Sequence, residues 1–144
     1  MYRVFVRHQV RQAFAQLSVG DWPSLLARMA PDVQHSFPGT SAVGGSRRGV
    51  DAVQAWSERL QRLLPGLVFD LHTVAVDGGP LDTRVGVQWT STAPLPDGST
   101  YTNRGAHIVR MSKARITSFH AYLENSAVLE RALQEVAAAG SHRA

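Results

Sequence analysis

The sequence predicts a single α+β domain, in which helices cover one face of a strongly curved antiparallel sheet. Two observations indicate this class. Apolar residues recur at helical spacing through residue 64, and from residue 67 the pattern changes to β-rich runs separated by short turns. The 144 residues show no repeat or linker, and a chain of this length folds as one domain. A bent sheet closed by helices encloses a cone, whose mouth is a natural small-molecule site.

Three helices precede the sheet. Val6, Val10 and Phe14 form an apolar stripe on the first. Asp21 can cap the second, and Pro65-Gly66 stops the third. We therefore expect helices over residues 4–17, 22–30 and 50–64. Between the second and third helices we expect a brief strand over 33–37 and a flexible loop over 38–46.

Four β-rich runs follow the third helix. They cover residues 67–76, 83–92, 99–111 and 115–125. Asp97-Gly98 marks a hairpin, because both residues tolerate the positive φ that such turns require. We expect the runs to form an antiparallel meander, followed by a helix over 127–139 and a frayed tail over 140–144.

Composition excludes several chemistries. The chain has no cysteine, which rules out disulfides, thiol nucleophiles, iron–sulfur clusters and cysteine-based zinc sites. His107 and His120 lack the spacing of a metal motif, so we expect no metal and no cofactor. No apolar run is long enough for a membrane span, and the arginine-rich start differs from a signal peptide. We expect a cytoplasmic protein with no membrane partner.

The charge balance is modestly basic. The net charge of +4 comes from 15 Lys and Arg residues against 11 Asp and Glu residues. Fourteen of these cations are Arg, and they are scattered along the chain. A nucleic-acid binder usually clusters its cations beside exposed aromatic rings. We therefore expect no nucleic-acid partner. Binding to such a partner would show a strongly salt-dependent affinity.

The last two predicted strands carry most of the polar chemistry. If Lys113-Ala114 forms a two-residue turn between them, His107 lies opposite His120, and Asn103 lies opposite Glu124. Imidazoles, phenols, an amide and a carboxylate on one face can polarise a carbonyl and move a proton. The set predicted to share that face is Tyr101, Asn103, His107, His120, Tyr122 and Glu124.

The opposite face of the last strand is the alternative. Phe119, Ala121 and Leu123 are the more apolar residues of that strand, and they favour a position in the core. A one-residue slip in register would then leave His120, Tyr122 and Glu124 on a solvated or dimer-forming face. Both registers stay open at this point.

Several phrases of the chain are similar to those of one known family. They are Gly20-Asp21, Ala30 to Val33, Phe37-Pro38-Gly39, Arg48 to Trp56, Leu64 to Phe69 and Asp97 to Asn103. With the order of elements, they resemble the SnoaL-like branch of the nuclear transport factor 2-like superfamily, which includes polyketide cyclases, ketosteroid isomerase and limonene epoxide hydrolase. The resemblance covers nearly the whole chain and implies a cone-shaped fold, with homodimers that form through the sheet.

The resemblance also implies an activity. In the polyketide cyclases an Asp near the end of the last strand acts as general acid/base, and the matching position here is Glu124. We therefore expect a cofactor-independent enzyme for acid/base cyclisation or isomerisation of a small, apolar, carbonyl-bearing molecule such as a polyketide intermediate. Glu124 would be the base, and His107 and His120 would orient it or donate hydrogen bonds. Tyr101, Asn103 and Tyr122 would position the substrate, with Phe37, Trp56 and Trp89 as apolar walls.

A second function class stays open. The same cone can serve a non-catalytic ligand-binding or dimerisation module, in which Glu124 is exposed or buried against a partner chain. The residues do not determine the substrate, nor do they decide among cyclisation, isomerisation, hydrolysis and dehydration.

Overall fold

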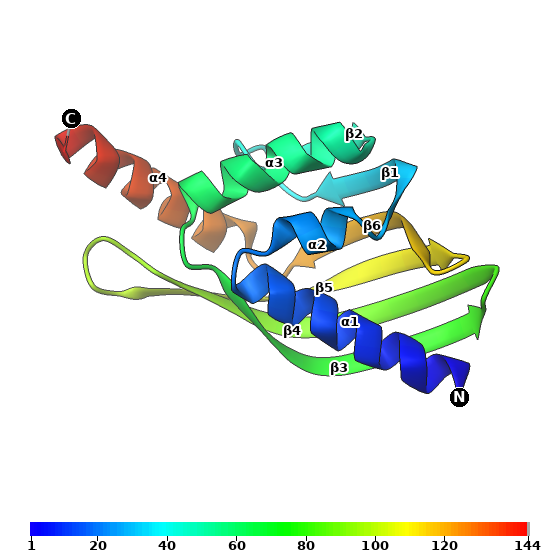
Figure 1. Ribbon diagram of the computed structural model, residues 1–144. Coiled ribbons are helices and arrows are strands. Elements are labelled where there is room, and N and C mark those ends of the chain that lie inside the picture. The colour runs from blue at the N-terminus through cyan, green and yellow to red at the C-terminus, as the bar shows by residue number, and fades with distance from the viewer. Residues whose placement is uncertain (144) are drawn as a thin grey trace.

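The computed structural model describes residues 1–143, with side chains through Gly140, and confirms the α+β class. The elements are α1 (Tyr2–Ser18), α2 (Trp22–Leu26), β1 (Met29–Phe37), β2 (Gly45–Arg48), α3 (Val50–Leu63), β3 (Val68–Gly79), β4 (Asp82–Pro94), β5 (Thr100–Ser112), β6 (Arg115–Leu123) and α4 (Ser126–Arg143). The six strands form a mixed sheet in the order β2-β1-β6-β5-β4-β3, in which β1 and β6 are parallel and the other neighbours antiparallel. Figure 1 shows α1, α2 and α3 on one side of this sheet.

The first three helices bury their apolar faces against the inner face of the sheet. The buried residues are Val6, Val10 and Phe14 on α1, Trp22 and Leu25 on α2, and Val53, Trp56 and Leu60 on α3. The predicted cap of α2 is confirmed, because the Asp21 carboxylate accepts a hydrogen bond from the Ser24 N–H at 3.3 Å.

Helix α2 is shorter than predicted because β1 begins early. It ends at Leu26 rather than at residue 30. Met29 already pairs with Ile116 of β6, whose N–H donates to the Arg28 carbonyl at 3.0 Å. Pairing with a strand far away in the sequence thus overrides the local helical preference of these residues.

The segment predicted as a flexible loop over 38–46 is partly ordered. Its end forms β2, an edge strand that places Arg47 opposite His35. Val43 is fully buried, and its carbonyl accepts a hydrogen bond from the Trp56 indole N–H at 2.8 Å. The expectation of a flexible loop is therefore wrong at Val43, which belongs to the core.

Strands β3 to β6 form the predicted antiparallel meander, but the predicted register of the last pair is wrong. The two-residue turn at 113–114 is present, with φ of 52° and 64°. Beyond it, a β-bulge leaves Thr117 as an extra residue in β6, so that Arg110 pairs with Ser118. One extra residue turns every later side chain of the strand to the opposite face.

The bulge decides which polar groups reach the inner face. His107 pairs with Ala121, and His120 pairs instead with Ile108. Ala121 and Phe119 are buried on the inner face, as in the alternative register. His120, Tyr122 and Glu124 therefore point to the outer face of the sheet.

Helix α4 begins at a capping residue and runs further than predicted. The Asn125 Oδ1 accepts hydrogen bonds from the N–H groups of Ala127 and Val128. The helix continues to Arg143, past the predicted end at 139, and residue 144 of the predicted tail lies outside the described residues. Within residues 1–143, no helix has the length and apolarity needed to cross a membrane. A cytoplasmic location stays a prediction.

Candidate functional site

A cavity of about 210 Å³ lies between the helices and the inner face of the sheet. Aromatic rings from both layers line it, among them Phe14, Trp22, Trp56, Phe69, Trp89 and Phe119. Its polar lining residues are Gln9, Arg28, Ser91, Tyr101 and His107. An apolar cavity with a few polar groups is the usual form of a small-molecule site.

The structure brings part of the predicted site together in this cavity. The predicted residues that line it are Phe37, Trp56, Trp89, Tyr101 and His107. Sequence reasoning missed Phe14, Trp22, Phe69 and Phe119 as walls. Three of these four rings, those of Phe14, Trp22 and Phe119, are buried in the structure. Their place on the apolar face of an element is the one sequence signal that could have identified them as walls.

His107 is the imidazole of the cavity, and one hydrogen bond fixes its protonation. The ring is only 7% exposed, and the Trp89 indole N–H donates to its Nδ1 at 2.8 Å. Because an indole can only donate, Nδ1 must be the acceptor and the neutral ring carries its hydrogen on Nε2. Among the described residues, no hydrogen bond engages Nε2. This N–H is therefore the group that His107 can offer to a ligand.

Burial keeps His107 neutral. Desolvation, with a smaller effect from His120, lowers the pKa of His107 from 6.5 to about 4. Protonation would also place a hydrogen on Nδ1 and remove the acceptor of the Trp89 hydrogen bond. At neutral pH the ring can donate a hydrogen bond to a carbonyl oxygen, while its Nδ1 is not free to take up a proton.

Tyr101 and Asn103 form a buried pair beside the cavity. The Asn103 amide donates from Nδ2 to the Tyr101 hydroxyl at 3.1 Å and to the Asn125 carbonyl at 2.8 Å. Burial raises the pKa of Tyr101 above its usual value. The phenol thus stays protonated at neutral pH. Through its two hydrogen bonds, Asn103 fixes the Tyr101 hydroxyl and connects β5 to Asn125 at the start of α4. A direct contact of Asn103 with a substrate stays a prediction.

The other three predicted site residues lie away from the cavity, and their predicted placement is wrong. The His120 Nδ1 and the Ser36 hydroxyl are 2.5 Å apart. Tyr122 is 57% exposed. The Glu124 side chain is 60% exposed and forms an ion pair with the Arg104 Nε at 3.1 Å. Thr117 is the cause, because the bulge turns all three side chains outward. None of the described cavity-lining side chains is a carboxylate.

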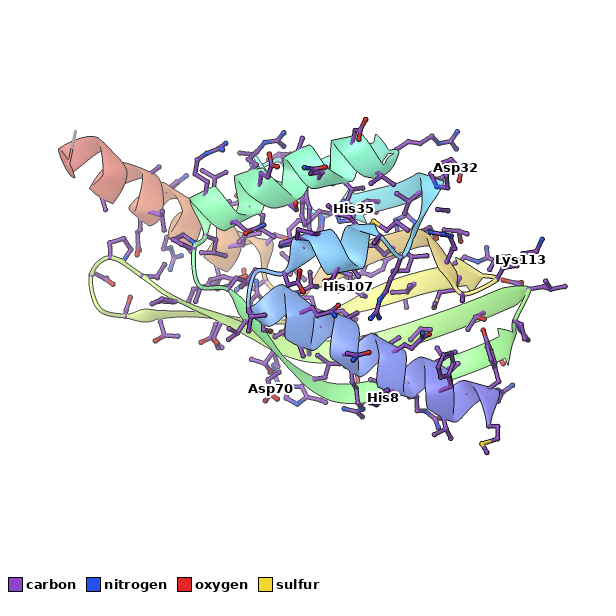
Figure 2. The ribbon with its side chains drawn as sticks, in the orientation of Figure 1. His8, Asp32, His35, Asp70, His107 and Lys113 are labelled. Atoms are coloured by element: carbon purple, nitrogen blue, oxygen red, sulfur yellow. The ribbon has the colours of Figure 1, made fainter. Side chains whose placement is uncertain are left out.

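His35 is a second buried imidazole that sequence reasoning did not include in the site. Its ring is 1% exposed and packs against Trp56 and Phe119, with centroids 4.2 Å apart in both pairs. In Figure 2, His35 and His107 both lie between the helices and the sheet. A signal for His35 is its place in a strand between buried Val33 and half-buried Phe37, but burial of its neighbours alone does not reveal the ring contacts.

The comparison with known families decides where the chain belongs. The profile of the SnoaL-like domain matches residues 10–119. The chain belongs to the SnoaL-like domain family. A search of curated proteins found no match to this SnoaL-like domain.

Solved structures share the fold of this SnoaL-like domain at low sequence identity. An NTF2-like protein of unknown function from Burkholderia pseudomallei K96243 is 22% identical, with a TM-score of 0.76 over 88% of this chain and 95% of its own. TerC, crystallised with polyporic acid, is 18% identical, with a TM-score of 0.76 over 93% and 99%. IdmH from Streptomyces antibioticus, a candidate polyketide cyclase, is 16% identical, with a TM-score of 0.70 over 85% and 94%. These likenesses show the NTF2-like fold.

Proposed function

We propose that this SnoaL-like domain binds a small, largely apolar molecule that carries a carbonyl group, and promotes its cyclisation or isomerisation by acid/base chemistry. The observation that carries the proposal is the buried, neutral imidazole of His107 in an aromatic cavity. A family that includes polyketide cyclases, and the likeness to IdmH and TerC, support a carbonyl-bearing ligand.

The Nε2–H of His107 supplies the chemistry. A hydrogen bond from this N–H to a carbonyl oxygen strengthens as the oxygen gains the negative charge of an enolate. The apolar walls exclude bulk water, which makes that interaction stronger than it is in solution. Aldol cyclisation and isomerisation beside a carbonyl both begin when the neighbouring carbon gives up a proton to form the enolate. Because none of the described lining side chains is a carboxylate, the proposal assigns this proton to a single water molecule that enters with the substrate. Glu124, the predicted base, lies outside the cavity, and the proposal gives it no contact with the substrate.

A non-catalytic ligand-binding module is the second candidate. It is favoured by the lack of a carboxylate among the described lining side chains, since such a group would be the usual acceptor for a carbon-bound proton. Both candidates use the same cavity and the same hydrogen bond. They differ in whether the bound carbonyl compound loses its α-hydrogens.

His107→Phe is expected to weaken binding of the bicyclic ketone 1-tetralone about fivefold, because one hydrogen bond contributes about 1 kcal/mol. Tetralin, which has the same frame without the oxygen, should bind both forms equally. Titration calorimetry measures the affinities, and NMR in deuterated water follows exchange of the hydrogens beside the carbonyl. Faster exchange with the natural protein indicates the enzyme, whereas binding without exchange indicates the module.

Glu124→Gln is the matched control for this experiment. Its side chain is exposed, so we expect unchanged affinity and unchanged exchange. A loss of exchange in Glu124→Gln, with His107→Phe unaffected, would restore the role predicted from the sequence and contradict the proposal.

We also propose that two chains pair through the outer face of the sheet. Ile108 and Tyr122 are 43% and 57% exposed on that face, on neighbouring strands. Ile108→Glu is expected to give a monomer in sedimentation measurements. Leu81→Glu, which places the same charge at the exposed β3–β4 turn, should leave the dimer intact. A natural protein that sediments as a monomer contradicts this pairing.

A further inference from the structure

Arg28 is the one charged side chain among the described residues that line the cavity. The other polar lining groups are an amide, two hydroxyls and the neutral imidazole of His107. Arg28 lies at the junction of α2 and β1, where it is half-buried. Because a guanidinium stays protonated in proteins, this residue gives the apolar cavity a permanent positive charge.

One hydrogen bond places the Arg28 guanidinium at the wall of the cavity. Its Nη1 donates to the Gln9 carbonyl of α1 at 3.5 Å, and Gln9 is itself a lining residue. The side chain therefore reaches from the α2–β1 junction to α1, which packs beside α2 (Figure 1). Since residues at both ends of this span line the cavity, the guanidinium is within reach of a ligand bound there.

The positive charge of Arg28 is not neutralised by any carboxylate whose side chain the structure describes. The described ion pairs are formed by four other arginines, Arg3, Arg84, Arg104 and Arg110. Within the same part of the chain, the Gln9 carbonyl is the hydrogen-bond partner of the Arg28 side chain, and its distance of 3.5 Å makes the bond weak. Burial costs a cation part of its hydration, and an anion beside it compensates for that loss. Most N–H donors of this guanidinium are thus available to an anionic group of a ligand.

The Arg28 guanidinium and the His107 imidazole lie at different levels of the same cavity. The rings of Phe14 and His107 pack with their centroids 5.4 Å apart, which gives the level of His107 along α1. Gln9, which holds the guanidinium, precedes Phe14 by five residues, or roughly 7.5 Å along the helix axis. A ligand that engages both groups therefore carries its two polar ends on an apolar frame of about that length.

We propose that the cavity binds an apolar keto acid, whose ketone accepts the hydrogen bond of His107 and whose carboxylate pairs with Arg28. A carboxylate can accept two parallel hydrogen bonds from a guanidinium, which fixes the direction in which the ligand enters. At any other place on the apolar wall the carboxylate would lose its hydration without compensation. Arg28 is thus a specificity-determining residue that favours the acid over a neutral ketone. This inference rests on the proposed function, since it requires that His107 binds the ketone.

The test compares 5-oxo-5-phenylpentanoic acid with 1-phenylpentan-1-one, which has the same frame without the carboxylate. Arg28→Met keeps an apolar stem and removes the charge. In titration calorimetry it is expected to weaken binding of the acid about tenfold, the lower end of what a hydrogen bond to a charged group contributes, and to leave binding of the neutral ketone within about twofold. Arg115→Met is the matched control, because this exposed arginine donates to the Ala27 carbonyl at 3.1 Å, next to Arg28, but does not line the cavity. It should leave the affinity for the acid within about twofold.

The outcomes separate this proposal from the proposed function. Equal affinity for the acid in the natural protein and in Arg28→Met overturns the pairing with Arg28. Equal weakening in Arg28→Met and Arg115→Met also overturns it, because the effect would then come from net charge and not from contact. Failure of 1-phenylpentan-1-one to bind the natural protein is instead the failure of the proposed function.

A second comparison uses the natural protein and does not depend on how well a variant folds. The amide 5-oxo-5-phenylpentanamide has the frame of the acid with an uncharged end, and we expect it to bind about tenfold more weakly than the acid. In NMR of the arginine side chains, the Arg28 N–H signal should shift when the acid is added and stay unchanged with 1-phenylpentan-1-one. An acid that binds no more tightly than the amide, or an Arg28 signal that the acid does not change, overturns the assignment.

Discussion

Replacing Gly105 with alanine is expected to lower the free energy of unfolding by about 3 kcal/mol, the upper end of what overpacking costs. A Cβ at this position would lie 2.3 Å from the Tyr122 carbonyl oxygen and 2.6 Å from the Trp89 ring. The first neighbour is backbone of β6, and the second is a buried indole that donates to His107. Neither can move without loss of a strand pairing or of the hydrogen bond that fixes the His107 tautomer.

Gly86→Ala is the matched control for that substitution. Gly86 lies in β4, and a Cβ there would meet only the flexible end of Ile108 at 3.9 Å. We expect it to leave stability unchanged or slightly higher, because glycine is unfavourable inside a strand. Urea unfolding followed by tryptophan fluorescence measures both variants. If Gly105→Ala unfolds at the same urea concentration as Gly86→Ala, the close packing of Trp89 on Gly105 is wrong.

Acidification from pH 7 to pH 4 is expected to lower the free energy of unfolding by about 3 kcal/mol through His107 alone. The pKa of this group is about 4 in the folded protein and 6.5 in the unfolded chain. Between these values the unfolded chain binds the additional proton, so stability is complete above pH 6.5 and is lost as the pH falls toward 4. His35, whose pKa is lowered to about 2, acts in the same direction.

The measurement is the urea midpoint of unfolding at several pH values between 7.5 and 4.5. Carboxylates with ordinary pKa values of about 4 begin to lose their charge only at the lower end of this range. His107→Phe should show a shallower decline than the natural protein. His8→Gln, which changes an exposed imidazole on α1, should show the natural decline. A midpoint that rises on acidification, or equal slopes in all three proteins, contradicts a neutral buried His107.

Local patterns in the chain were enough to predict most elements. Helical spacing of Val6, Val10 and Phe14 corresponds to the buried face of α1, and the Asp97-Gly98 signal falls in the turn between β4 and β5. These features depend on residues near one another in the sequence. The ends of elements were less accurate: α2 stops early because β1 pairs with β6, a contact between segments far apart in the chain.

The candidate site was only partly predictable for the same reason. Trp56, Trp89 and His107 lie on the faces that their periodicity indicates, and they line the cavity. The prediction that Glu124 faces the cavity as a base depended on a continuous register from the turn at 113–114. The bulge at Thr117 interrupts that register. Nothing in the alternation of residues marks that extra residue, because the apolar set of β6 is compatible with either face until the packing around it is known.

By itself, the sequence determined that this chain forms helices packed on an antiparallel meander, with an aromatic cavity and without thiol chemistry. Only the tertiary structure decided which polar groups face that cavity and in which tautomer. The reason is physical: the register of β6 depends on how its neighbours β5 and β1 pack together, and the hydrogens of His107 and His35 are fixed by Trp89 and Arg47. Those donors lie on neighbouring strands, so folding must bring them to the imidazoles before the rings have a defined chemistry.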